Sequence, residues 1–155
     1  LNGYAKMRST KIADFDHGIF VAVYPTYFYG LLAPIFRMKN SFPPIVLEAL
    51  EGISDVKGEN TVVLDLRELD NAVCDYFIIT EAQSSTQVSA LSGAVEKRLR
   101  EQCDERPWHI EGSQESEWIL MDYVHVVVHI FQREARTFYD IEGLWGDATH
   151  TAIPS

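Results

Sequence analysis

The stretch that decides the fold is Trp118–Phe131, which reads Trp-Ile-Leu-Met-Asp-Tyr-Val-His-Val-Val-Val-His-Ile-Phe. Two apolar runs flank a short break, and the second run is rich in β-branched residues that favour extended backbone. The pattern predicts a hairpin of two strands, Trp118–Met121 and Val126–Phe131. An aromatic and acidic segment, Arg136–Trp145, follows it. Together they favour a surface that docks on a basic partner over a catalytic site.

Upstream of the hairpin, helical and strand patterns alternate along the chain. Apolar residues at helical spacing predict helices, and short apolar runs bounded by polar breaks predict strands. The expected elements are a helix at Pro43–Val56, strands at Thr61–Leu66 and Tyr76–Thr80, a helix from Ser84 or Ser85 to Cys103, a strand at Pro107–Glu111, the hairpin, and one or two helical turns at Arg133–Tyr139. Glu142–Ser155 is expected to be an ordered stub that frays into a tail. We predict an α/β fold with a mixed five-stranded sheet packed by helices.

The charge of the chain indicates the class of partner. Its 155 residues suit one domain and include 13 Lys and Arg against 23 Asp and Glu, a formal net charge of −10. Binding to phosphate backbones needs clustered basic residues, so we expect no direct sequence-specific nucleic-acid binding. A basic protein partner is favoured, because complementary potentials steer encounter.

The first 37 residues differ in composition from the remainder. Leu1–Arg37 holds four of the 13 basic and two of the 23 acidic residues, so the remainder carries a formal charge of −12. A basic start before the apolar run Gly18–Phe36 is one pattern of a secretory or membrane segment. A spanning helix needs about 20 mostly apolar residues, however, and prolines interrupt this run. We interpret residues 1–37 as an atypical extension, either spurious translation upstream of Met38 or disorder, and assign the domain to residues 38–155. We expect no membrane association and a cytoplasmic location.

Histidines and cysteines do not form a recognisable metal motif. His125 and His129 are four residues apart, which on a strand separates them by about 13 Å, too far to share one ion. We interpret His129 as a histidine on a sheet face, either packed with a hydrogen-bond partner or exposed for contact. Cys74 and Cys103 are expected to be two buried thiols rather than a disulfide. No metal is predicted.

Residues that could support catalysis are equally scattered. Two-metal nucleotidyl transfer needs carboxylates that converge on ions about 4 Å apart, whereas Asp65, Asp75 and Asp122 fall on separate elements. Ser84 suits a helix cap, and Cys74 lacks an activating neighbour. We therefore predict a protein that is not an enzyme and uses no cofactor. A degenerate or undetected nucleotidyltransferase is the alternative.

The aromatic residues divide into two groups. Three are interpreted as ordinary core residues: Trp108, Phe138 and Tyr76. For Trp118 and Tyr139 both a core and a docking role are open, because Tyr and Trp offer large contact area with few rotors. Trp118 shares a strand face with Leu120 and Asp122 by two-residue alternation.

An ordered set of motifs runs from about Phe42 to Ile153. The motifs are Val-Val-Leu-Asp-Leu66, Cys-Asp-Tyr-Phe-Ile-Ile79, Ser84-Ser85 before Gln87-Val88, Pro107-Trp-His-Ile-Glu-Gly112, Trp118-Ile-Leu-Met-Asp122, Val126-Val-Val-His-Ile-Phe131 and Arg136-x-Phe-Tyr-x-Ile-Glu-x-Leu-Trp145. With these spacings the set resembles the ribosomal silencing factor family, also called iojap-like. The ending Leu144-Trp-Gly-Asp-Ala148 is similar to members from Bacteroidetes-type bacteria.

The resemblance implies a fold, a partner and a mechanism. The fold would have nucleotidyltransferase-like topology without known catalysis, and often forms a homodimer. The family binds the large ribosomal subunit through its ribosomal protein 14, blocks joining of the small subunit and represses translation when nutrients are short. A role in ribosome biogenesis is also implied.

Partner-binding residues follow from the resemblance by position. Family contacts fall on Trp118, Leu120, Asp122 and Tyr139. Physical reasoning extends the predicted site to Arg136, Glu142 and Trp145. The acidic members of this set would meet basic groups on the ribosomal protein.

The chain departs from the family pattern at two places. Many members have Gly and then Asp where this chain has Val124 and His125, which affects the expected turn geometry and one acidic contact. Members often have Gly after the second strand, where this chain has Ala82 preceded by Glu81. A glycine-dependent backbone angle is not assumed there.

Overall fold

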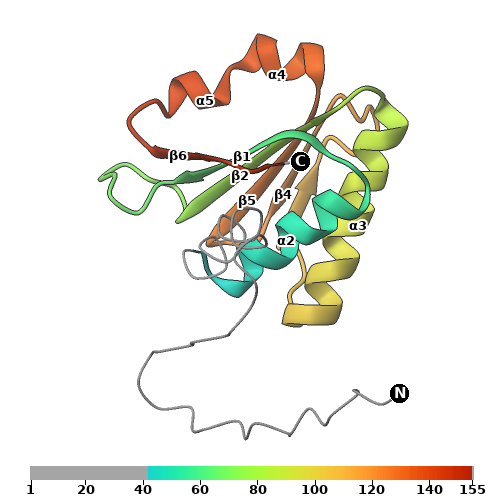
Figure 1. Ribbon diagram of the computed structural model, residues 1–155, viewed down its shortest axis with the longest axis horizontal. Coiled ribbons are helices and arrows are strands. Elements are labelled where there is room, and N and C mark those ends of the chain that lie inside the picture. The colour runs from blue at the N-terminus through green and yellow to red at the C-terminus, as the bar shows by residue number, and fades with distance from the viewer. Residues whose placement is uncertain (1–41, 155) are drawn as a thin grey trace, which may run out of the picture. The chain divides into compact units, whose positions relative to one another are not determined.

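The expected hairpin lies within a six-stranded mixed sheet (Figure 1). The protein is described by a computed structural model over residues 42–154, and the predictions for residues 1–37 lie outside this range. The elements are α2 (Pro44–Asp55), β1 (Glu59–Asp65), β2 (Tyr76–Ala82), α3 (Ser85–Cys103), β3 (His109–Glu111), β4 (Trp118–Asp122), β5 (Val126–Gln132), α4 (Arg133–Tyr139), α5 (Ile141–Leu144) and β6 (Thr149–Ala152). The prediction of a mixed α/β sheet packed by helices is confirmed.

The order of the strands explains why the hairpin is central. Across the sheet the order is β3-β4-β5-β2-β1-β6. β5 pairs antiparallel with β4 on one side and parallel with β2 on the other. Because β5 is covered on both faces, it has the continuous apolar run that is typical of a buried strand. β5 therefore joins β3 and β4 on one side of the sheet to β2, β1 and β6 on the other.

The prediction of five strands, with a fraying tail after residue 142, is wrong. The last part of the described chain forms α5 and then β6, which pairs antiparallel with β1 from Val62–Ala152 to Asp65–Thr149. The sequence Thr-His-Thr-Ala has no apolar alternation, so its pattern did not predict a strand. The segment is ordered because its backbone forms hydrogen bonds with the edge of β1.

The two faces of the sheet carry different covers (Figure 1). α2 and α3 pack on one face, where apolar residues from both helices meet β2, β4 and β5. The short α4–α5 segment lies over the opposite face, where a smaller cluster gathers Phe77, Phe131 and Trp145. This second cover is only a few turns long, and the residues of β3 and β4 on this face stay partly or fully exposed.

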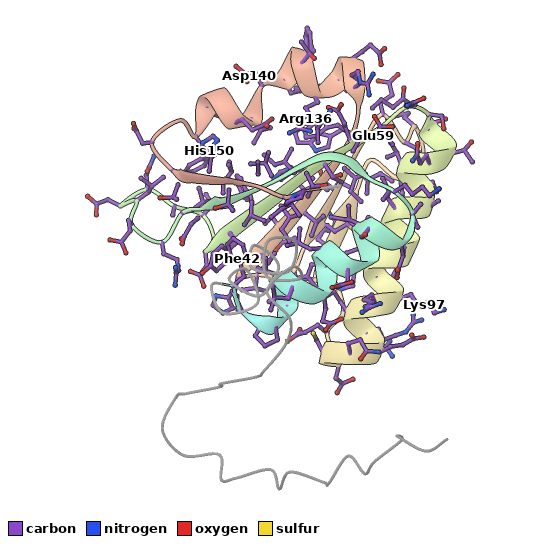
Figure 2. All side chains as sticks on the ribbon, viewed as in Figure 1. Phe42, Glu59, Lys97, Arg136, Asp140 and His150 are labelled. Atoms are coloured by element: carbon purple, nitrogen blue, oxygen red, sulfur yellow. The ribbon has the colours of Figure 1, made fainter. Side chains whose placement is uncertain are left out.

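Local signals at the helix ends agree with the sequence. The Ser84 hydroxyl accepts a hydrogen bond from the amide of Gln87 and so caps α3 as predicted. Asp140, labelled in Figure 2, joins α4 to α5 in the left-handed region at φ 42°, and its carboxylate accepts from the Gly143 amide at 3.1 Å. This residue is both the C-cap of α4 and the N-cap of α5.

Among the described helices, none is both long enough and apolar enough to cross a membrane.

The hairpin turn holds a valine in a conformation that favours glycine. Val124 has φ 72°, and the amide of His125 donates to the carbonyl of Tyr123 at 2.9 Å, which closes a three-residue turn. The carboxylate of Asp122 accepts from the Val124 amide at 2.7 Å. The turn thus has a left-handed residue at the position where the resemblance led us to expect Gly, and valine is strained there. At the other departure, Ala82 ends β2 and needs no such angle.

Replacing Val124 by glycine should stabilise the domain. Relief of the strained φ is worth about 1–2 kcal/mol, and the greater freedom of glycine in the unfolded chain offsets about 0.5–1 kcal/mol of it. We expect Val124→Gly to raise the free energy of unfolding by up to about 1 kcal/mol, measured by urea denaturation. Val73→Gly is the matched control, because Val73 is exposed and its φ is not positive. This substitution should leave the free energy of unfolding unchanged or lower it. Equal effects of both changes would contradict the strain argument.

Candidate functional site

Strand β4 presents three predicted docking residues on one face. Its alternation buries Ile119 and Met121 against the α3 side, while Trp118, Leu120 and Asp122 remain partly exposed on the opposite side. The shared face that two-residue spacing predicted is therefore present. It is the part of the sheet that α4–α5 does not fully cover.

Trp118 and Tyr139 come together from different elements. The ring of Trp118 stacks on Phe131 at 4.9 Å between centroids and lies 4.7 Å from the ring of Tyr139 at the end of α4. Tyr139 is half exposed and also meets the edge of Phe138 at 5.1 Å. The structure thus joins a core role and surface exposure in the same pair. This arrangement, which we call the aromatic pair, consists of Trp118 and Tyr139.

Two of the three aromatic residues interpreted as core are on the surface. Trp108 and Phe138 are each 82 % exposed, whereas Tyr76 is buried as expected. Trp108 precedes the short edge strand β3, where no layer covers it. Phe138 lies on α4. None of the residues of this helix is buried, and the side chain of Phe138 faces solvent. Whether these side chains are exposed depends on which elements pack beside them, and sequence periodicity does not predict that packing.

The predicted docking residue Trp145 packs inward instead of projecting alone. Its ring meets Phe77 of β2 edge-on at 5.6 Å between centroids. It is one of the partly buried residues of the smaller cluster, together with Ile141 of α5. Trp145 therefore attaches the end of the α4–α5 segment to the sheet.

Arg136 and Glu142 pair with each other inside the chain. One guanidinium nitrogen of Arg136 lies 2.6 Å from a carboxylate oxygen of Glu142, and another lies 3.2 Å from Glu81. The side chain of Arg136 is only 11 % exposed and that of Glu81 only 7 %. Arg136 also donates to the carbonyl of Asn60 at 2.7 Å. Figure 2 shows Arg136 on the side of α4 toward the sheet.

The charge environment keeps Arg136 protonated. Burial pulls the pKa of Arg136 down, but hydrogen bonds and charge interactions with Glu142 and Glu81 outweigh it and hold this pKa above its ordinary value. The second arginine of α4, Arg133, also contacts Glu81, at 3.1 Å. Glu81, which precedes the Ala82 departure, is thus the buried centre of an ion-pair network that attaches α4 to β2.

His129 lies beneath the aromatic pair. Its Nδ1 accepts a hydrogen bond from the indole Nε1–H of Trp118 at 3.3 Å, and its ring meets the edge of Phe77 at 4.7 Å. The side chain is buried, and burial lowers the pKa of His129 to about 4. Of the two interpretations left open by the sequence, the packed histidine with a hydrogen-bond partner is confirmed.

Acid should destabilise the domain through His129. In the unfolded chain its pKa is about 6.5, against about 4 when folded, so between these values the unfolded state binds the extra proton. The contribution is therefore full above about pH 6.5 and is lost as pH falls, by at most about 1.4 kcal/mol per pH unit. Urea unfolding from about pH 7 to pH 5 measures this slope. His129→Gln should show a shallower slope, and an unchanged slope would contradict the assignment.

Acidic residues surround the open face of β3 and β4. Glu111 pairs in register with Leu120, and Asp122 pairs with His109. His109 lies 2.9 Å from Glu111, and His125, which follows Val124 at the hairpin turn, lies 3.2 Å from Asp75. The partners of Glu111 and Asp75 are thus histidines and not lysines or arginines. The face therefore presents net negative charge around an aromatic centre.

The residues considered for catalysis have structural partners. Asp65 pairs with Arg67, and that hydrogen bond lowers the pKa of Asp65. Burial raises the pKa of the Cys74 thiol to about 11, so it is mostly protonated at neutral pH. Within residues 42–154 no three His, Cys, Asp or Glu side chains gather as a metal site would require. Cys103 is free as well and is only partly buried.

Comparison with known proteins places this site in a family. The model of the family described as "Ribosomal silencing factor during starvation" matches residues 39–155, a range that includes every predicted docking residue. The chain belongs to the ribosomal silencing factor family. The resemblance stated from the motifs is thereby confirmed.

Relatives and a solved structure agree with this membership. The chain is 35 % identical over 100 residues to the ribosomal silencing factor of Halalkalibacterium halodurans, covering 64 % of this chain and 84 % of that one. It is 35 % identical over 103 residues to that of Bacillus subtilis, covering 64 % and 83 %. A crystal structure from Chromobacterium violaceum superposes with a TM-score of 0.63 at 34 % identity, covering 72 % and 88 %. The relatives' names describe ribosomal silencing factors, not enzymes.

Proposed function

We propose that this ribosomal silencing factor binds the large ribosomal subunit through its ribosomal protein 14 and sterically blocks joining of the small subunit. Repression of translation under nutrient limitation follows, without a cofactor, in the cytoplasm. The observation that carries the proposal is the partly exposed aromatic pair, Trp118 and Tyr139, at the edge of an acidic sheet face in a member of this family.

The aromatic pair has the properties of an interface anchor. Trp and Tyr are enriched among residues that dominate binding energy, and in the free protein Trp118 already stacks on Phe131 and contacts Tyr139. A rigid anchor loses little side-chain entropy on binding. Leu120 extends the apolar centre along β4, and Asp122 and Glu111 form the acidic rim. A basic protein surface is complementary to this pattern.

The remaining predicted residues support the surface from behind. Arg136, Glu142 and Trp145 are engaged within the chain, where they attach α4–α5 to the sheet. We assign them a positioning role in docking, because they place Tyr139 beside Trp118. The domain that carries the function is residues 38–155.

A subunit-joining assay tests the proposal. Purified large subunits are incubated with the protein, small subunits are added, and sucrose gradients separate joined from free subunits. We expect the protein to co-sediment with large subunits and to reduce joining in proportion to its occupancy, because a bound protein need only overlap the footprint of the small subunit. A protein that leaves joining unchanged at saturating occupancy would refute the mechanism. Metal-dependent incorporation of labelled nucleotides would instead support a nucleotidyltransferase.

A further inference from the structure

The buried histidine of β5 contacts the docking tryptophan directly. Trp118 and His129 lie diagonally across β4 and β5, since Trp118 pairs with Phe131 and Leu120 pairs with His129. The indole Nε1–H donates to Nδ1 of the imidazole at 3.3 Å, and the two ring centroids are 5.8 Å apart. This bond links a residue of the surface to one that is only 4 % exposed.

The imidazole has little freedom to move. The edge contact with Phe77 fixes it on the β2 side, and Phe131 lies nearly parallel to it at 6.2 Å between centroids. Because Nδ1 accepts the indole hydrogen, the neutral ring carries its own hydrogen on Nε2. Within residues 42–154, Nε2 is buried and has no hydrogen-bond partner.

An unpartnered buried N–H is costly, so this position is poorly explained by packing alone. An apolar side chain of similar size would fill the space beside Phe77 without burying a donor. What the histidine supplies, and an aliphatic residue does not, is the acceptor for the indole. The function of His129 is therefore to be sought in the bond to Trp118.

We propose that His129 is a positioning residue that fixes the indole of Trp118 in the orientation that docks on the ribosomal protein. This inference rests on the proposed function, which it deepens. Stacking on Phe131 and contact with Tyr139 restrict the plane of the indole. They do not by themselves select which edge of the ring points inward, because a half-turn about the Cβ–Cγ bond leaves the plane of the indole unchanged. The hydrogen bond distinguishes the two orientations and so preorganises the anchor.

The groups around His129 keep it able to accept. Apolar and aromatic residues from β2, β4 and α5 surround it in the smaller cluster, whose ionisable members and neighbours are Cys74 and Tyr139. The charged residues of the same face are Glu111 on β3, Asp122 on β4 and the Glu81 network under α4. Within the described chain none of them forms an ion pair with His129. Its low pKa, which burial causes, leaves Nδ1 unprotonated throughout the neutral range.

Two substitutions separate positioning from packing. His129→Leu keeps an apolar side chain but removes the acceptor, whereas His129→Gln offers a carbonyl acceptor again. The readouts are the NMR signal of the Trp118 indole N–H, assigned with Trp118→Phe, and affinity for large ribosomal subunits. We expect His129→Leu to shift the indole signal, to speed its hydrogen exchange and to weaken binding about tenfold. His129→Gln should restore most of the indole signal and its exchange rate, and most of the binding affinity.

The outcomes distinguish this inference from the proposed function. If Trp118→Ala abolishes binding but His129→Leu binds as the wild type does, the positioning role is refuted and the docking surface stands. If Trp118→Ala also binds normally, the proposed docking surface itself fails.

The unaltered protein provides a test that does not depend on a variant folding. Between about pH 7 and pH 5 its Trp118 indole signal should not move, because burial keeps the pKa of His129 near 4. A transition centred near pH 6.5, the ordinary value, would mean that the imidazole is exposed, and would overturn the inference.

Discussion

Trp118→Ala should weaken binding to large ribosomal subunits by about 100-fold or more, since central aromatic anchors typically contribute at least about 2–3 kcal/mol. The substitution removes the partly exposed ring and also the neighbour that holds Tyr139 in place at 4.7 Å. The loss should appear mainly as faster dissociation, because interface truncations act chiefly on that rate. Co-sedimentation over a range of protein concentrations measures the affinity.

The chain contains a matched control for this experiment. Trp108 is the same residue type, precedes β3 and is 82 % exposed, outside the aromatic pair. Trp108→Ala should bind nearly as the wild type does. Thermal unfolding of both variants must show that the domain stays folded under the binding conditions, because Trp118 also packs on Phe131. Equal losses from both substitutions would indicate general aromatic stickiness and refute a specific site.

Arg136→Met should lower the free energy of unfolding by up to about 3 kcal/mol, the lower end of the cost of removing one partner from a buried ion pair, because Arg133 still contacts Glu81 at 3.1 Å. The reason lies in what remains: Glu81, whose side chain is 7 % exposed, loses the guanidinium 3.2 Å away. Glu142 loses its partner as well. We expect the α4–α5 segment to loosen, so that Tyr139 no longer supports Trp118. Urea unfolding gives the stability, and subunit affinity reports the displaced aromatic pair.

A second substitution tests whether the weaker compensation of the buried Glu81 charge is the cause. Adding Glu81→Gln to Arg136→Met removes the buried negative charge and should recover part of the lost stability. Arg67→Ala is the comparison for an exposed pair, since the side chain of Arg67 is 53 % exposed and its partner is Asp65. It should leave the unfolding midpoint nearly unchanged. A comparable loss from Arg67→Ala, or no recovery in the double variant, would contradict this account.

Sequence patterns were most informative where one residue's environment follows from its immediate neighbours. Alternation in β4 placed Trp118 and Leu120 on one face, and the β-branched run identified β5 as a buried strand. Ser84 was correctly expected to cap α3. These features depend on local backbone geometry, which residues within a few positions determine.

Patterns failed where partners distant in sequence decide the outcome. Arg136 was expected to meet a partner, yet it binds Glu81, which is 55 residues away. Trp108 was expected in the core but lies exposed, because no layer covers the sheet edge there. The sequence pattern did not predict β6, because this segment forms a strand only through backbone pairing with β1.

By itself the sequence determined the family, the order of most elements and the face of β4 that carries Trp118. Only the tertiary structure decided that Tyr139 completes the aromatic pair, that His129 accepts from Trp118 and that Arg136 acts inside the chain. The physical reason is that hydrogen bonds and ion pairs depend on distances of about 3 Å between groups. Such distances arise only when the sheet order β3-β4-β5-β2-β1-β6 brings remote segments together.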